Sequence, residues 1–405
     1  MESDLKTKTT TAFIWSKILG TPFWALLNTL PIILYKEFDA SPFLITLMVA
    51  LKPASALLAT YWSILFSKNE KLLGFNLVLT NILRFAPFLL CFFVPSPLLL
   101  VCFFCLYMTL SRGAVPAWTQ MFKNHVSYHS QSNVFALGNA IEYAGMTIIP
   151  LLLGFVLDLN HDSWRWLFMA SALLGISSTL FLLRIPSLVS SKELSLLKPS
   201  MKEIFLPWKR SFNLIKSRAD FRRYLVGFML GGAGLMIIQP VLPLFFVDVL
   251  NLSYTEMVFA MTVCKAIGFS IASPFWARYF KRANFYFFSA CVALLAAFFP
   301  LLLLGAQWML PLLFAAYLFY GLMQSGSELS WHMSATTFSK NEDSIPFSET
   351  NILAVGIRGC IVPFLGYLIF TSMNSIAVMV VSCFLCLFGT HLLYRSRKTE
   401  SELFT

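Results

Sequence analysis

Apolar runs of about 20 residues recur along the whole chain, and a transmembrane helix needs a run of about this length. We place them near residues 12–35, 42–66, 72–94, 97–121, 133–157, 164–185, 222–247, 255–279, 284–304, 307–333, 347–371 and 374–394. In lipid every backbone polar group needs an internal partner, so only helices and closed barrels cross a membrane. Transmembrane strands are much shorter than these runs. The sequence therefore predicts an all-α polytopic membrane protein with twelve transmembrane helices.

The amino-acid composition excludes a soluble domain. The chain is 58% hydrophobic and only 12% charged, whereas soluble domains carry about 25% charged residues. Its eight cysteines all lie in apolar runs. Cys383 and Cys386 have a CxxC spacing but no second pair of ligands, so we expect neither a metal nor a cofactor. We find no phosphate-binding GxxxxGK[ST] loop and no nucleophile–base arrangement, and therefore expect no enzymatic activity.

The basic residues predict the topology. An even number of helices puts both termini on one face, and most of the 30 Lys and Arg residues, Lys17 among them, then lie in segments on that face. The outer loops hold only Lys36 and Arg165. By the positive-inside rule both termini are cytoplasmic, and we expect the plasma (inner) membrane. The net charge of +11 then indicates contact with anionic lipid rather than with nucleic acid.

The longest loop divides the chain into two halves of six runs. We expect a cytoplasmic N-terminus (1–11), a six-helix bundle (12–185), a basic linker (186–220), a second bundle (221–394) and a cytoplasmic tail (395–405). Within the linker, residues 201–216 alternate apolar and basic side chains. This pattern is typical of a helix lying on the membrane surface; the alternative is a tether with no further function.

The two halves repeat each other. Residues of the first half recur 213 positions later in the same order: Lys52 and Lys265, Tyr107 and Tyr320, Gly113 and Gly326, Trp118 and Trp331, Pro150 and Pro363. An ordered series of this kind indicates an internal structural repeat. It predicts two pseudo-symmetric six-helix bundles around a central cavity.

Six plus six helices, a long basic central loop and parallel halves resemble the major facilitator superfamily of secondary transporters, across essentially the whole chain. The family often carries Gly-x-x-x-Asp-Arg-x-Gly-Arg between helices 2 and 3. Here that place has Lys68, Glu70 and Lys71 but no glycine or aspartate. Arg112-Gly113 resembles the helix-4 arginine motif that the family uses in proton coupling, with Pro116 where glycine is usual. The resemblance implies that helices 1, 4, 7 and 10 line the cavity, and we expect a monomer.

Few charged residues fall inside the predicted spans: Lys52, Arg84, Arg112, Glu142, Lys265, Glu328 and Arg358. Each costs about 2.5–3.5 kcal/mol in mid-membrane, so they must face water, each other or a ligand. The positive excess predicts an anionic or zwitterionic solute. We assign solute binding to Lys52, Lys265, Arg112 and Arg358, with Asn28 and Gln239 as neutral contacts. The alternative is that the two lysines pair with Glu142 and Glu328 only to hold helices together, and Arg84 is interpreted as structural.

Glu328 is the first candidate for coupling transport to protons. Gln324, Glu328, Trp331 and His332 lie on one face of a helix, and a carboxylate beside an imidazole can carry a proton. Glu142 is the second candidate. The alternative is that each glutamate is a permanent counter-ion. The sequence thus predicts a secondary active transporter with a small solute, a coupling ion such as the proton and membrane lipids as partners. A membrane sensor or lipid-handling protein without solute flux is the alternative.

Overall fold

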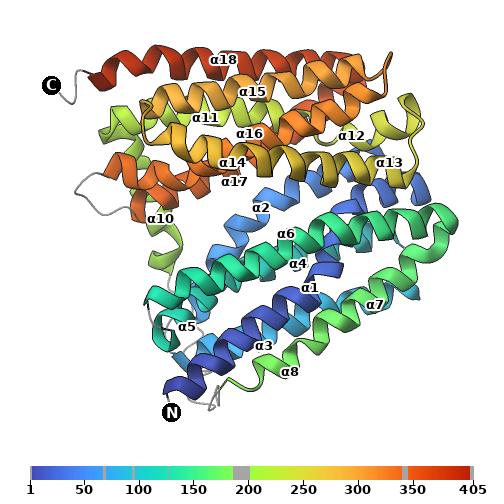
Figure 1. Cartoon of the computed structure of the whole chain (residues 1–405), viewed down its shortest axis with the longest axis vertical. Coiled ribbons are helices and arrows are strands. Elements are labelled where there is room, and N and C mark those ends of the chain that lie inside the picture. The colour runs from blue at the N-terminus through green and yellow to red at the C-terminus, as the bar shows by residue number, and fades with distance from the viewer. Residues whose placement is uncertain are drawn as a thin grey trace. The chain divides into compact units, whose positions relative to one another are not determined.

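The computed structural model describes residues 2–66, 70–93, 96–126, 128–185, 201–339 and 345–401. Every regular element in these ranges is a helix (Figure 1), which confirms the all-α prediction. The N-terminal elements are α1 (Glu2–Phe38), α2 (Pro42–Phe66), α3 (Glu70–Phe85), the 3-10 helix η1 (Ala86–Phe92), α4 (Pro97–Gly113), α5 (Val115–His125), α6 (Tyr128–Leu159), η2 (His161–Ser163), α7 (Trp164–Ser177) and α8 (Thr179–Leu182).

The later elements begin with α10 (Met201–Ser217), which lies in the predicted linker. It is followed by α11 (Ala219–Ile238), α12 (Leu242–Leu244), the π-helical η3 (Phe245–Val249), α13 (Tyr254–Val258), the π-helical η4 (Phe259–Cys264), α14 (Lys265–Phe280), α15 (Phe285–Gly305), α16 (Pro311–Ser339), α17 (Ile345–Ser372) and α18 (Ser375–Ser401).

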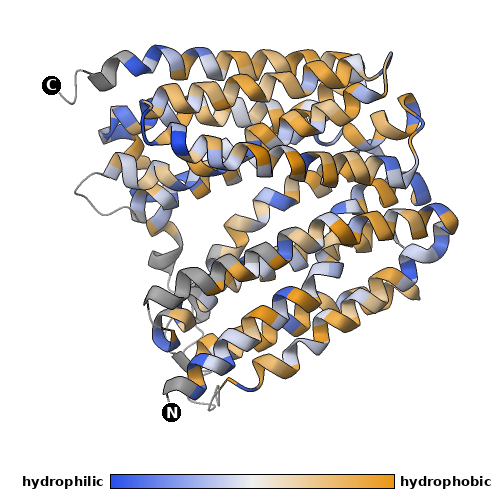
Figure 2. Cartoon of the chain, viewed as in Figure 1, coloured by the Kyte–Doolittle hydropathy of each residue, from blue (hydrophilic) through white to orange (hydrophobic). Residues whose placement is uncertain are grey.

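Among the described residues, ten helical segments are long and apolar enough to cross a membrane. Figure 2 shows hydrophobic residues along the middle of most long helices and hydrophilic ones mainly near their ends. The other two predicted runs lie in α6 and α16. In α6 the apolar stretch Ala144–Leu159 is shorter than a full crossing. In α16 the polar residues lower the mean hydropathy of the helix. Twelve crossings therefore stay a prediction.

The chain divides into two compact units. The N-terminal unit comprises Met1–Ala40 and Ala54–Ile204, and the C-terminal unit comprises Ser41–Pro53 and Phe205–Thr405. The sequence predicts one bundle over 12–185, but the first half of α2 packs against α17. There Phe43 contacts the rings of Phe364 and Tyr367, and Pro53 lies against Gly359.

The core of the N-terminal unit is aromatic. Phe23 of α1 is fully buried, and its ring contacts those of Phe85, Phe88, Tyr107 and Phe168. These rings bring α3, η1, α4 and α7 together around α1. Burial of large aromatic side chains supplies much of the packing energy of such a core.

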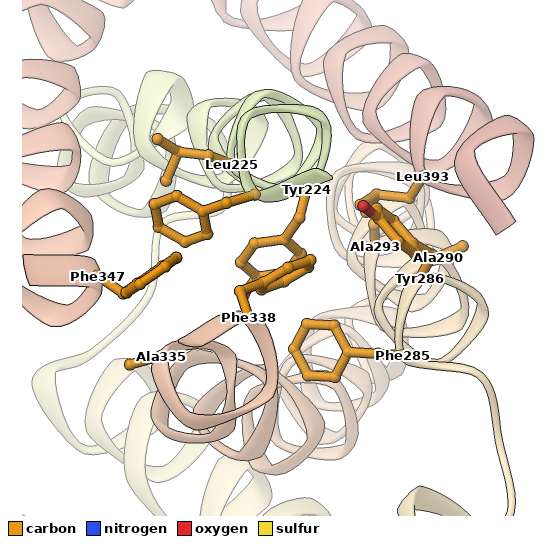
Figure 3. Close-up of a cluster of buried hydrophobic side chains, with 11 residues drawn as sticks. Tyr224, Leu225, Phe285, Tyr286, Ala290, Ala293, Ala335, Phe338, Phe347 and Leu393 are labelled. Carbon is orange, nitrogen blue, oxygen red and sulfur yellow. The ribbon is translucent and has the colours of Figure 1, made fainter. Parts of the chain in front are cut away.

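The core of the C-terminal unit joins five helices, because Leu393 of α18 packs into the same cluster as residues of α11, α15, α16 and α17. Figure 3 shows Tyr224 of α11, Phe285 of α15, Phe338 of α16 and Phe347 of α17 pointing toward one another. The Tyr224 hydroxyl lies 3.3 Å from the Ser330 hydroxyl, which satisfies its polar tip in the apolar surroundings.

α11, α15 and α18 run side by side in this unit (Figure 1). Ser382 donates a hydrogen bond of 2.6 Å to the Gly234 carbonyl, and the Cys386 thiol lies 3.5 Å from the Gly231 carbonyl. Small residues at these positions let α11 and α18 approach closely. Cys386 is fully buried in this contact, as expected of a packing residue.

Candidate functional site

Three intramembrane charges of the C-terminal unit, Lys265, Glu328 and Arg358, gather around one face of α16. Tyr320, Gln324 and Glu328 follow one another at intervals of four residues, which places them on that face. The Gln324 amide donates a hydrogen bond of 3.0 Å to the Glu328 carboxylate. We call these three residues, together with Lys265 and Arg358, the C-terminal charge cluster.

Lys265 of α14 reaches this face of α16. Its ammonium nitrogen lies 5.9 Å from the centre of the Tyr320 ring, within cation–π range, and it interacts electrostatically with Glu328. Lys265 also follows directly on the π-helical η4, and such π segments are frequent at functional sites. The structure therefore brings together Lys265 and Glu328. For this pair the sequence allows two roles, solute binding or an ion pair that only holds helices together.

A close approach of two backbones holds Lys265 in place. A Cβ atom built at Gly321 of α16 would stand 2.0 Å from the Lys265 carbonyl oxygen, so only glycine fits there. Gly321→Ala is expected to push α14 away from α16 and to lower the apparent melting temperature of the purified protein by several degrees, because overpacking costs about 1–3 kcal/mol.

Gly20→Ala is the matched control for this substitution. A Cβ atom at Gly20 of α1 would meet nothing nearer than Phe85, at 3.8 Å, and alanine is the better helix former. We expect an unchanged or raised melting temperature. Equal behaviour of the two variants would contradict the close contact between α14 and α16.

Arg358 of α17 completes the C-terminal charge cluster. Its Nη1 donates a 3.4 Å hydrogen bond to the Met229 carbonyl of α11. The guanidinium lies over Gly232, where a Cβ atom would stand 1.9 Å from Nη1. It also interacts electrostatically with Tyr320. Within the described residues its buried Nε has no hydrogen-bond partner. A buried N–H donor without an acceptor lowers the stability of the folded protein, and a bound ligand can supply the acceptor.

Lys52 belongs to the same unit as Lys265. The repeat predicts one lysine in each bundle, but the first half of α2 groups with the C-terminal unit. Lys52 is exposed and precedes Pro53, which packs against Gly359, the residue after Arg358. The positive charges predicted for solute binding are therefore concentrated in this unit, with the exception of Arg112.

A second charge cluster lies in the N-terminal unit. Lys17 of α1 forms an ion pair with Glu142 of α6. Arg84 of α3 donates a 2.6 Å hydrogen bond to Asn81, stacks over Phe85 and interacts electrostatically with Glu142 and Tyr107. Within its own unit, Glu142 thus has Lys17 as an ion-pair partner, a residue that the sequence-based topology places among the inner basic residues.

The ion pair of Lys17 and Glu142 is expected to stabilise the N-terminal unit. Both side chains are about 30% exposed, so Lys17→Met is expected to cost about 2 kcal/mol, less than a fully buried pair would. The double variant Lys17→Met/Glu142→Met should regain much of this loss, because it leaves no charge without a partner. A double-mutant cycle in apparent melting temperature tests this, and strictly additive effects would contradict the pair.

Each of the two clusters contains a tyrosine, and the two tyrosines occupy equivalent positions of the repeat. Tyr107 and Tyr320 lie 213 residues apart, and each interacts electrostatically with an arginine and a glutamate of its own unit. Tyr107 also stacks on Trp24, with ring centres 6.0 Å apart. Neither tyrosine is among the predicted site residues, although the repeat spacing marks both. The arginines carry no such signal, because Arg84 and Arg358 lie on non-equivalent helices.

The remaining predicted residues are found on other parts of the helices. Asn28 and Gln239 donate hydrogen bonds to the carbonyls of Trp24 and Leu235, four residues earlier in each case. Arg112 is half-buried in the last turn of α4. His332 is exposed, whereas the Glu328 carboxylate accepts a hydrogen bond from Gln324. The carboxylate–imidazole pair stays a prediction.

A family model matches most of the chain. The model of the Major Facilitator Superfamily matches residues 13–344. The chain belongs to this superfamily. Comparison with curated proteins finds no match.

Solved transporter structures share the fold over nearly the whole chain. A point mutant of the nucleoside transporter NupG superposes with a TM-score of 0.69 at 14% identity, covering 97% of this chain and 98% of that one. A POT family transporter in complex with 5-aminolevulinic acid gives 0.72 at 11% identity, covering 95% of both chains. A bacterial homologue of the human lysosomal transporter Spinster gives 0.67 at 13% identity, covering 98% and 97%.

The family match and the apolar helices identify an integral membrane transport protein rather than an enzyme. Identities of 11–14% indicate a shared fold, and the choice of solute depends on the charged residues of this superfamily member itself.

Proposed function

We propose that the protein is a secondary active transporter that moves a small anionic or zwitterionic solute by alternating access. The observation that carries the proposal is the concentration of positive charge in the C-terminal unit, which holds Lys52, Lys265 and Arg358. In the C-terminal charge cluster, Lys265 interacts electrostatically with Glu328 and Arg358 with Tyr320.

Excess positive charge in a low-dielectric region attracts anions. Arg358 is suited to a carboxylate or phosphate, because its planar guanidinium matches two oxygens at once. Its buried Nε has no partner within the described residues, and a solute oxygen would satisfy it. A zwitterion would in addition place its ammonium group near Glu328. The fold accommodates a solute of this kind in the POT family neighbour, which was solved with 5-aminolevulinic acid.

Proton coupling or exchange follows from the surroundings of Glu328. Its carboxylate accepts a hydrogen bond from the neutral Gln324 amide and faces the positive charge of Lys265. A proton on Glu328 would release Lys265 to the solute, and loss of the proton would restore the contact. Such an exchange of partners can be linked to the rocking of one half against the other in transporters of this type.

The positive-inside distribution supports twelve crossings with cytoplasmic termini in the plasma (inner) membrane. Labelling of single cysteines introduced at Lys36 and Lys216 with a membrane-impermeant reagent tests this orientation in intact cells. We expect labelling at position 36 only, and labelling at position 216 would contradict it.

Flux through reconstituted liposomes tests the transport function. Liposomes loaded with one unlabelled compound at a time, drawn from carboxylates, phosphorylated sugars, amino acids and nucleosides, would be assayed for accumulation of the same labelled compound. We expect counterflow with an anionic or zwitterionic compound and none in protein-free liposomes. Binding in a thermal-shift assay without flux would favour the alternative, a membrane sensor or lipid-handling protein.

A further inference from the structure

Helix α10 presents three different faces. Its inner face packs on the C-terminal unit: Ser211 is buried, and Leu214 and Ile215 pack against the aromatic core of Figure 3. This contact anchors the helix, so α10 is more than a tether between the two halves.

An apolar stripe on α10 is exposed. Phe205, Trp208 and Phe212 are 63%, 38% and 69% exposed. Their spacing of three, four and seven residues places them on one side of the helix. Three large exposed side chains in a row are costly in water, and such a patch marks a surface that contacts another apolar phase.

Basic side chains flank this stripe. Lys209 and Lys216 are exposed and, at 100° per residue, lie beside Phe205 and Phe212 on the helix surface. Arg210 extends the basic side. An apolar stripe bordered by lysine and arginine is the pattern of helices that lie in the membrane interface.

The junction with α11 holds α10 at the level of the membrane surface. Arg218, the single residue between the two helices, bonds to Asp220 at 2.8 Å and to the Phe338 carbonyl at 2.6 Å. Arg222 donates a 3.0 Å hydrogen bond to the Ile215 carbonyl. α11 begins at Ala219 and is apolar enough to cross the membrane. A helix fixed to the start of a crossing helix therefore lies where headgroups begin.

We propose that α10 is an interfacial anchor that binds anionic phospholipid. The stripe of Phe205, Trp208 and Phe212 enters the headgroup–acyl boundary, and Lys209 and Lys216 contact headgroup phosphates. Each basic residue near an anionic surface is expected to contribute about a fivefold factor in binding. This inference depends on the protein being integral to the membrane and is independent of the solute proposed above.

Trp208 provides a local probe of the anchor. The full-length protein is placed in nanodiscs of phosphatidylcholine with a minor fraction of phosphatidylglycerol, and either lipid carries bromine near the top of its acyl chains. The chain has ten tryptophans, so the signal of Trp208 is the difference between the wild type and Trp208→Phe. We expect quenching of this difference signal, and stronger quenching when the bromine is on phosphatidylglycerol.

Two charge variants test the headgroup contact. Lys209→Gln/Lys216→Gln is expected to remove the preference for brominated phosphatidylglycerol while quenching by phosphatidylcholine persists. Lys281→Gln/Arg282→Gln, which removes two exposed charges at the end of α14, should keep the preference. No quenching of Trp208 by either lipid would overturn the proposal and indicate a protein partner on this face. Equal quenching by both lipids in the wild type would overturn the binding of anionic headgroups.

Discussion

Arg358→Gln is expected to raise the KM for the transported anion by about tenfold or more, because a hydrogen bond to a charged partner contributes about 1.5–3 kcal/mol. The guanidinium lies against Gly232 and donates a hydrogen bond to the Met229 carbonyl. These contacts fix the direction of its Nε, which has no hydrogen-bond partner among the described residues. Glutamine keeps much of the side-chain length but lacks the positive charge and the planar array of N–H donors of the guanidinium. Proteoliposome uptake over a range of solute concentrations measures the effect.

Two further arginine variants show whether this effect is specific. Arg358→Lys keeps the charge without the planar fork, and we expect an intermediate KM. Arg84→Gln removes a charge that also lies beside a tyrosine and a glutamate, and whose buried Nε likewise has no hydrogen-bond partner among the described residues, but in the N-terminal unit. Because Arg84 bonds to Asn81, we expect a lower melting temperature with KM unchanged. A wild-type KM in correctly folded Arg358→Gln would exclude Arg358 from the solute site.

Glu328→Gln is expected to abolish uptake driven by a pH gradient while leaving exchange of internal for external solute. Glutamine preserves the shape of the side chain and can still bond to Gln324, but it cannot take up and release a proton. Coupled uptake should fall to the background of protein-free liposomes, and counterflow should stay within about fivefold of the wild type, since the lost contact with Lys265 is worth about 1 kcal/mol or less in the exchange step.

The same assay on Glu142→Gln distinguishes the two glutamates. Because Glu142 is paired with Lys17, we expect this variant to lose stability and to retain pH-driven uptake. Loss of coupling in Glu142→Gln but not in Glu328→Gln would place coupling in the N-terminal unit. Unchanged coupled uptake in both variants would show that neither carboxylate carries the proton.

Contacts within a single helix were predictable from the sequence. Gln324 and Glu328 are four residues apart, and the regular geometry of a helix places them side by side; the structure joins them by a hydrogen bond. The repeat spacing likewise marks Tyr107 and Tyr320, and the length of the apolar runs determines the helical class. Each of these inferences requires only local periodicity or comparison of the chain with itself.

Contacts between helices required the tertiary structure. Lys17 lies opposite Glu142, 125 positions later in the chain, because α1 packs against α6. Lys52 joins the C-terminal unit because Phe43 and Pro53 fit against α17. A charged side chain within the membrane needs a partner, because lipid alone does not stabilise its charge. The sequence by itself therefore determined that such partners exist. Which partner each charge meets depends on the rotation and axial position of every helix, and side-chain packing throughout the bundle sets both.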